Sequence, residues 1–364
     1  EGNQIKKYVK ILCAALSMAI VFSLAACGGA DTGGAATDDG PAPSGGGSAG
    51  GLETHVVATV PKLIGNNWFD SMDWEGQRWA EKNGAEHHYV GPVEFDSAAQ
   101  LQCLNDAIAL QPDILTVVPI AADACDELLK QAKDMGCTVV THEGNTLKNI
   151  DYNVDAFVNE EFGVNFAQKT AEIAGEDAVV ALTVGQLTVP SHNAWAQAFY
   201  AYAKENYPNM TFVNPMDGDK PIPYESMDSS EESYKVAKEL IQANPDLTAI
   251  FAGSASSTNG IARAVREMNK VGKIKVLGIG EASGLQVEFE EGSVQYSAFW
   301  YPGHAQYAAY EVGKRVRDGV EIKDGDNLGV DGYESVTIVD GNNICGRAWI
   351  DVTPENYKEM AEIL

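Results

Sequence analysis

Short runs of β-branched and apolar residues alternate along this chain with longer amphipathic stretches, and this alternation restricts the fold more than any other feature. The run 114–118, Ile-Leu-Thr-Val-Val, is apolar almost throughout. Such a run is typical of a strand buried on both faces of a parallel sheet, which needs helices above and below it. The pattern therefore predicts an α/β protein.

The repeat falls into two blocks of similar size. The first block predicts strands at 55–60, 86–90, 114–118 and 138–141, with helices at 68–83, 97–110 and 122–135. After a pause over 149–158, the second predicts strands at 178–184, 210–214, 248–252 and 275–280, with helices at 191–207, 229–243, 257–269 and 283–290. A strand at 294–300, a helix at 302–317, a strand at 335–339 and a helix at 353–364 follow. Two such blocks predict two doubly wound, Rossmann-like lobes, whose ligands bind at the carboxyl ends of the strands.

The first 27 residues have the composition of an export signal. Three lysines, Lys6, Lys7 and Lys10, precede the apolar run 11–26, and Leu24-Ala25-Ala26-Cys27 resembles a bacterial lipobox. The apolar run is shorter than the roughly 20 residues that span a bilayer, although a plain membrane anchor or a buried helix is the alternative. The composition of residues 28–53 predicts a flexible Gly/Ala/Ser linker. We therefore expect a lipid on Cys27 and an extracytoplasmic protein anchored to the cell membrane.

Composition and motifs exclude several classes of function. With 52 acidic against 25 basic residues and a net charge of −27, the chain is not expected to bind nucleic acid. GxSxG and HExxH are absent, and 278–284 departs from GxGxxG by one residue, so we expect no enzyme, no cofactor and no metal. The cysteines expected in the folded part form either disulfides or buried thiols: Cys103, Cys125, Cys137 and Cys345.

The segment 60–69, Val-Pro-Lys-Leu-Ile-Gly-Asn-Asn-Trp-Phe, resembles the opening of sugar-type periplasmic binding proteins, most of all the rhamnose- and autoinducer-2-binding branch. Segments 149–154 and 244–247 support the resemblance. It implies a type I fold with three hinge crossings, near Asp155, Trp300 and Val330. The implied N-terminal lobe is 54–155 plus 301–330, and the implied C-terminal lobe is 156–300 plus 331–364.

The resemblance also implies a function. A monomer would capture a monosaccharide or a related small polyol or furanose and deliver it to the permease of an ABC importer. The alternative is an autoinducer-2-like receptor that signals to a membrane sensor. A third hypothesis, an extracellular hydrolase, rests only on the carboxylates Asp123, Glu143 and Glu281.

Five candidate ligand contacts lie in the first block. The rings of Trp68 and Phe69 suit the face of a sugar, or they cap the core. Lys62 offers donors to a ring oxygen, or it is a solvated lysine at a strand end. Asp123 binds two sugar hydroxyls in the family, and an aspartate there is also a natural helix N-cap. His142 and Glu143 stand where ribose-type relatives carry Asp-Arg, so the recognised hydroxyl pattern should differ.

The second block supplies the remaining candidates. Ser191 and His192 stand where the autoinducer-2 receptors carry an Asp-Gln pair, which weakens the case for autoinducer-2 as the ligand. Trp195 matches the tryptophan of those receptors. Ser191 is alternatively a helix N-cap. Ser254 and Ala255 lie where those receptors show Asp-Ala, and the serine either donates to ligand oxygens or caps a helix. Two further loop-end residues complete the predicted ligand site: Glu281 and Trp300.

Overall fold

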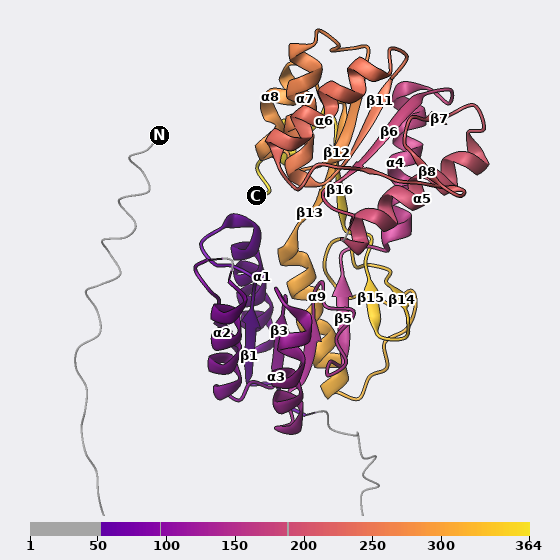
Figure 1. The fold of residues 1–364 in the computed structure, drawn as a ribbon. Helices are drawn as coiled ribbons and strands as arrows, with labels where there is room; N and C mark the ends of the chain where they lie inside the picture. The colour runs from indigo at the N-terminus through magenta and orange to yellow at the C-terminus, as the bar shows by residue number, and fades with distance from the viewer. Residues whose placement is uncertain (1–51, 95, 188) are drawn as a thin grey trace, which may run out of the picture. The chain divides into compact units, whose positions relative to one another are not determined.

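A computed structural model describes residues 52–94, 96–187 and 189–364. In this part of the chain it confirms the predicted α/β fold with two mainly parallel sheets, each covered by helices (Figure 1). We call each sheet with its helices a lobe. The predicted lipid site, Cys27, lies outside the described residues.

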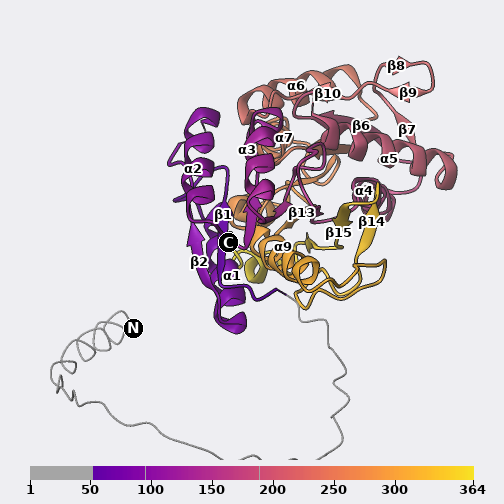
Figure 2. The ribbon, with the colours of Figure 1, turned by 90° about the horizontal axis from the view of Figure 1, so that it is seen from below.

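The first sheet has seven strands. In spatial order they are β14 (Thr337–Val339), β15 (Asn343–Cys345), β5 (Tyr152–Asp155), β4 (Thr138–Thr141), β3 (Ile114–Val117), β1 (Val56–Val60) and β2 (Glu86–Tyr89). Its helices are α1 (Asn67–Asn83), α2 (Ser97–Ala109), α3 (Ala122–Asp134) and α9 (Pro302–Arg317). Helices α2 and α3 pack on the face that Ala58 and Leu115 share, and α1 and α9 pack on the face of Val57 and Ile114. Figure 2 shows the two helix pairs from below.

The second sheet runs β10 (Tyr224–Glu225), β6 (Val179–Val184), β11 (Ala249–Gly253), β12 (Lys275–Ile279), β13 (Tyr296–Trp300) and β16 (Trp349–Val352), with β7 (Thr211–Phe212) beside β6. One face carries α4 (Asn159–Ala174) and α5 (Pro190–Asn206), and the other carries α6 (Ser230–Ala243) and α7 (Ala255–Glu267). Shorter elements are the hairpin β8 (Met216–Asp217) and β9 (Lys220–Pro221), the 3-10 turn η2 (Ser283–Leu285), α8 (Gln286–Glu290) and α10 (Tyr357–Met360).

Local sequence sets the ends of α1, the helix that carries the predicted aromatic pair. Asn66 precedes it in an extended conformation, and its side-chain oxygen accepts a hydrogen bond from the Trp68 N–H. Gly84 ends it with a φ of 72°, a left-handed conformation that glycine adopts without strain. Trp68 and Phe69 are therefore held in the first turn of the helix that follows β1.

Sheet membership corrects the predicted lobe boundary near the C-terminus. Because β15 pairs with β5 and β14 pairs with β15, residues 337–345 belong to the first sheet and not to the C-terminal lobe. Strand β16 then pairs antiparallel with β13 in the second sheet, so the third crossing lies between Cys345 and Trp349 and not near Val330. After β5 the chain passes to α4 and β6 of the second sheet, and after β13 it passes to α9, which packs on the first sheet.

Some elements differ from the prediction. Strand β5 occupies much of the predicted pause, and α4, which follows it, was not predicted. The predicted helix 353–364 contains only the single turn α10. The four described cysteines are free thiols, so the disulfide alternative is wrong. Burial raises the pKa of Cys137 to about 12 and that of Cys345 to about 12, which keeps both thiols protonated and unreactive.

The contact between α6 and α7 depends on a glycine. A Cβ atom at Gly260 would lie 2.0 Å from the Ser230 carbonyl oxygen and 2.1 Å from the Ser233 hydroxyl. We expect Gly260→Ala to lower the free energy of unfolding by about 1–3 kcal/mol, because the two helices must separate. Urea unfolding measures this. Gly284→Ala is the control, since its Cβ meets nothing within 4 Å, and equal effects of the two changes would contradict the prediction.

Candidate functional site

Two residues predicted separately as ligand contacts form an ion pair. Lys62 follows β1 and Glu143 follows β4, and Lys62 Nζ lies 2.5 Å from Glu143 Oε2 although the residues are 81 positions apart. Both strands end at the same edge of the first sheet, which brings the two side chains together. The pair leaves Lys62 two further N–H donors and Glu143 further lone pairs, so together they offer both kinds of hydrogen bond to a hydroxyl group.

The electrostatics of Glu143 reflect this pairing. Burial acts to raise the pKa of the Glu143 carboxyl, but the opposing effects of Lys62 and His142 are larger in sum and lower it. A carboxyl whose pKa is lower in the folded than in the unfolded state stabilises the fold above the ordinary carboxyl range. That contribution is lost as the pH falls through the lowered value.

Exchange of Lys62 for methionine should therefore raise the pKa of Glu143, because it removes the ammonium group that lowers this pKa. The variant's stability should also fall less steeply on acidification than that of the wild type. A carbon-detected NMR titration gives the pKa, and urea unfolding between neutral and acidic pH gives the stability. Lys130→Met, which removes an exposed pair with Asp134, is the control and should leave Glu143 unchanged. An unchanged pKa of Glu143 in Lys62→Met would contradict the proposed cause.

His142 is buried beside this pair with a defined tautomer. Its Nδ1 lies 2.7 Å from the Val154 carbonyl oxygen, and because a carbonyl only accepts, Nδ1 carries the proton. Its Nε2 is buried and has no hydrogen-bond partner among the described residues, and Glu143 Oε1 lies 3.8 Å away. His142 thus belongs to the packing beneath the loop, whereas Glu143 reaches the surface.

The other polar candidate of the first lobe is Asp123. Ala121 occupies the N-cap position of α3, so the N-cap alternative for Asp123 is wrong, and Asp123 lies in the first turn itself. Its carboxylate is exposed and has no hydrogen bond or ion pair within the part of the chain that the structure describes. A carboxylate at the N-terminus of a helix is stabilised by the helix dipole, so Asp123 is available as an acceptor.

The predicted aromatic residues lie in different surroundings. Trp68, half-buried, packs edge-on against Trp300 at the end of β13, with ring centroids 5.1 Å apart. Trp68 comes from the first lobe and also contacts the core of the second. The Trp300 Nε1 atom is buried without a partner in the described residues. Phe69 is half-buried, and its carbonyl accepts a hydrogen bond from the Tyr89 hydroxyl.

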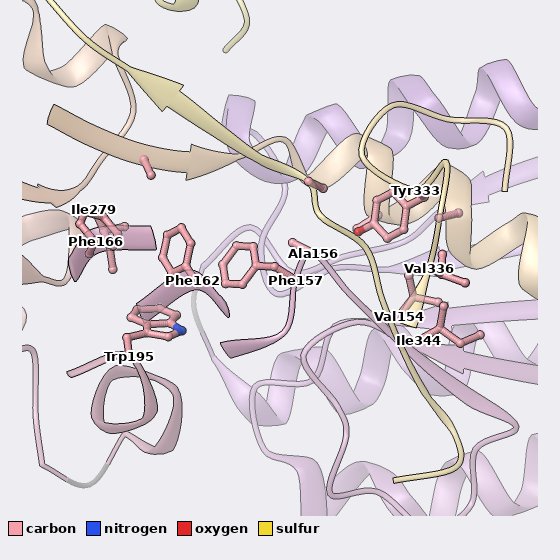
Figure 3. Close-up of a cluster of buried hydrophobic side chains, with 14 of the residues drawn as sticks. Val154, Ala156, Phe157, Phe162, Phe166, Trp195, Ile279, Tyr333, Val336 and Ile344 are labelled. Carbon is pink, nitrogen blue, oxygen red and sulfur yellow. The ribbon is translucent and has the colours of Figure 1, made fainter. Parts of the chain in front are cut away.

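Trp195 lies deeper. Only 5% of its surface is exposed, and its Nε1 donates to Asn159 Oδ1 at 2.7 Å. Figure 3 shows it beside Phe162 and Phe157, and Phe157 in turn lies 5.4 Å from Trp300 between ring centroids. Phe157, at the first crossing, thus links Trp195 to the Trp68–Trp300 pair. The prediction did not include Phe157, although an aromatic residue directly after the Asp155 crossing was a signal.

The candidates of the second lobe lie at the ends of β6, β11 and β12. Ser191 is in the first turn of α5, where Val189 holds the N-cap position, so its N-cap alternative is wrong. His192 Nδ1 accepts a long hydrogen bond of 3.3 Å from the Gly185 N–H, so in the neutral ring Nε2 carries the proton. Burial lowers the pKa of His192 despite the opposing charge of Asp228.

A chain of serine hydroxyls determines the direction of the hydrogen bond that Ser254 makes. Ser226 donates to the Val184 carbonyl, so it accepts from Ser257, which in turn accepts from Ser254. Ser254 therefore directs its proton inward and offers only lone pairs on its other side. The neighbouring Ala255 is exposed, at the start of α7.

Glu281 follows β12 and accepts a weak hydrogen bond of 3.4 Å from the Ser283 hydroxyl. Burial raises the pKa of the Glu281 carboxyl, and the Ser283 hydrogen bond opposes that rise only in part. Glu281 therefore takes up a proton more readily than an exposed glutamate, and as the neutral acid it can donate as well as accept a hydrogen bond.

Other features of the described residues do not compete with this site. A cavity of about 370 Å³ lies by the opposite, amino-terminal ends of β3 and β4, with Asp113 and Cys137 in its wall, and none of the candidate residues lines it. No cluster of His, Cys, Asp or Glu among the described residues could hold a metal. Within the same residues, no helix is long and apolar enough to span a membrane.

The chain is similar to known proteins in sequence and in structure. The profile of a family described as "Periplasmic binding protein domain" matches residues 57–321. A D-ribose/D-allose-binding protein of Pseudomonas aeruginosa is 26% identical in an alignment of 257 positions that covers 66% of this chain and 76% of that protein. A sugar ABC transporter protein from Actinomyces odontolyticus has a similar structure, with a TM-score of 0.73 and 21% identity over 84% of this chain and 97% of that one. LsrB from Clostridium saccharobutylicum, solved in complex with AI-2, gives a TM-score of 0.63 and 19% identity over 84% of this chain and 99% of that one.

Proposed function

The chain belongs to the periplasmic binding protein family, a family of solute-binding proteins rather than enzymes, and on that premise we propose that it captures a monosaccharide or related small polyol outside the cytoplasm. The captured sugar is then delivered to the permease of an ABC importer. The likeness to a D-ribose/D-allose-binding protein and to a sugar ABC transporter protein supports this proposal.

One observation in the structure supports a ligand with several hydroxyl groups. The Lys62–Glu143 pair and the free Asp123 carboxylate lie after β1, β4 and β3, which are neighbours in the first sheet. Grouped donors and acceptors of this kind suit a ligand with several hydroxyl groups. Trp68, in the first turn of α1, offers an aromatic ring for the apolar face of a sugar.

The second lobe supplies the other half of the proposed site. Ser191, His192, Ser254 and Glu281 follow strands of its sheet, and the lobes are joined by three connections, after Asp155, Trp300 and Cys345. Rotation about these connections closes the lobes on the sugar, and burial of the ligand stabilises the closed state. We place the lobe boundaries at these connections.

A titration panel tests the proposal. Isothermal titration of the folded protein with D-ribose, D-allose, L-rhamnose and autoinducer-2 is expected to give heat with at least one of the three sugars. A positive result should be accompanied by a higher melting temperature, because a ligand that binds only the folded state stabilises it. No heat and no melting shift with any compound of a wider set of sugars and polyols would reject the proposal.

Reception of an autoinducer-2-like signal is the second candidate. The likeness to LsrB in complex with AI-2 favours it. Ser191 and His192 speak against it, because a serine does not replace the two acceptor oxygens of a carboxylate. Heat from autoinducer-2 alone in the panel would favour this candidate over sugar import.

We also propose that a lipid on Cys27 anchors the protein to the outer face of the cytoplasmic membrane. The support is the Leu24-Ala25-Ala26-Cys27 sequence after a basic and an apolar segment. Cys27→Ala in the full chain should shift the protein from the membrane fraction to the soluble fraction of expressing bacteria. Mass spectrometry of the wild type should show a lipid-modified Cys27, and an unmodified cysteine would exclude the anchor.

A further inference from the structure

Asn153, in β5, is fully buried and connects three segments of the first lobe. Its Oδ1 accepts from the Thr141 hydroxyl and from the Gly144 N–H, both at 2.8 Å. Its Nδ2 donates to Asn343 Oδ1 in β15, again at 2.8 Å. One side chain thus joins the loop after β4 to both β5 and β15.

The loop after β4 is bonded to β5 at three successive residues. Besides the Gly144 bond to Asn153, His142 Nδ1 donates to the Val154 carbonyl, and the Glu143 N–H donates to Asp155 Oδ1 at 3.1 Å. On its other side the Asp155 carbonyl accepts from the Gly346 N–H, directly after β15. Asp155 therefore lies between the candidate ligand loop and the third connection.

These bonds hold the loop in a conformation that its own sequence does not favour. Glu143 has a φ of 56°, which is uncommon for a residue with a side chain. A Cβ at Gly144 would lie 2.8 Å from Thr141 Cβ, so the loop has no room for a larger residue. Because the surroundings impose this conformation, they also determine where the Glu143 carboxylate meets Lys62.

We propose that Asn153 and Asp155 are positioning residues, which set the Lys62–Glu143 pair and transmit its state to the connections that follow β5 and β15. Neither residue needs to touch the ligand. Where it concerns ligand binding, the inference rests on the proposed function, but the coupling itself exists in the ligand-free protein. Loss of the Lys62–Glu143 pair should therefore change the dynamics of the connections that follow β5 and β15.

Hydrogen–deuterium exchange of the ligand-free protein tests the coupling. In Lys62→Met, segments 152–156 and 342–347 should exchange about threefold faster or more than in the wild type, because the bonds of Asn153 and Asp155 open more often. Helix α6 serves as an internal reference. Lys130→Met again removes a lysine–carboxylate pair of the same 2.5 Å length from the same lobe, and should leave 342–347 unchanged. Unchanged exchange of 342–347 in Lys62→Met overturns the proposal.

A double-mutant cycle tests the effect on binding, with whichever of D-ribose, D-allose or L-rhamnose the wild type binds. Lys62→Met should weaken binding about tenfold or more, and Asp155→Ala about threefold or more. The double variant should bind within about twofold of Lys62→Met alone, because both changes act through the same pair. Asp155→Asn should restore near wild-type affinity, since its amide oxygen can still accept from the Glu143 N–H.

The possible failures are distinguishable. Additive losses in the cycle would show that Asp155 acts independently of Lys62, which contradicts the proposal. If the wild type binds none of the three sugars, the proposed function is weakened, while the exchange experiment still decides the coupling. Melting temperatures of all variants, measured without sugar, identify any variant that is merely unfolded.

Discussion

Replacing Phe157 with alanine is expected to lower the free energy of unfolding by about 3–5 kcal/mol. Only 6% of the Phe157 surface is exposed. Its ring stacks on Phe162 with a centroid separation of 4.1 Å and lies 5.9 Å from Trp349. Removal leaves a cavity between rings that come from several elements, and such rings do not collapse easily into the space.

Urea unfolding followed by far-ultraviolet circular dichroism measures this loss. Phe157→Leu keeps most of the volume and should cost less than about 1.5 kcal/mol. Phe212→Ala is a second control, because Phe212 lies in the edge strand β7 and is only half-buried. A loss below about 1 kcal/mol for Phe157→Ala would show that the cluster does not depend on this ring.

The position of Phe157 explains the size of the expected effect. It directly follows the first connection, and it touches Trp300 from the second connection and Trp349 from the third. The three connections are therefore packed on one another through aromatic side chains and not only linked through the backbone. A change at Phe157 should disturb all three together.

Much of the fold could be predicted because its signal is local. Continuous apolar strands and the helical spacing of the segments between them lie within short windows of sequence. Helix α4 had such a signal too, since Phe162 and Phe166 are one turn apart and both fully buried, yet it was missed. Strand β5 had none, because its buried Asn153 is polar and only partners far along the chain satisfy it.

The third crossing was misplaced for a related physical reason. Strands β14 and β15 are only three residues long, and their place in the first sheet depends on the pairing of β15 with β5, almost 200 residues earlier. No periodicity develops over three residues. Gly346, where a Cβ would lie 2.5 Å from the Gly332 carbonyl oxygen, marks the true turn from one lobe to the other.

The candidate site was predictable in residue type but not in pairing. The order of strands and helices in the sequence predicts that Lys62, Glu143 and Asp123 each follow a strand of one sheet. The sequence does not show the backbone angles, and two features of the site depend on them. One is the ion pair between Lys62 and Glu143, and the other is that Ala121, not Asp123, occupies the N-cap position. The same holds for Trp195, whose burial and bond to Asn159 come from the packing of α4 on α5.

Exchange of Trp68 for alanine should weaken the binding of whichever panel sugar the protein binds by about 10- to 100-fold. On the proposed function, the Trp68 ring covers the apolar face of the sugar, and its edge-on contact with Trp300 holds the ring in place. Trp68→Phe, which keeps a flat ring, should lose less affinity. Isothermal titration gives the dissociation constants, and melting temperatures without sugar confirm that each variant is folded.

Trp74 provides the matched control within the same helix. It lies six residues after Trp68 in α1, but it is 50% exposed and has no ring contact with another aromatic residue in the described part of the chain. Trp74→Ala removes the same side chain from the same helix and should leave sugar affinity unchanged. Equal losses for the two variants would mean that α1 affects binding through its stability alone. A loss confined to Trp68→Ala would support a direct contact, because only Trp68 lies at the carboxyl edge of the first sheet and touches the second lobe.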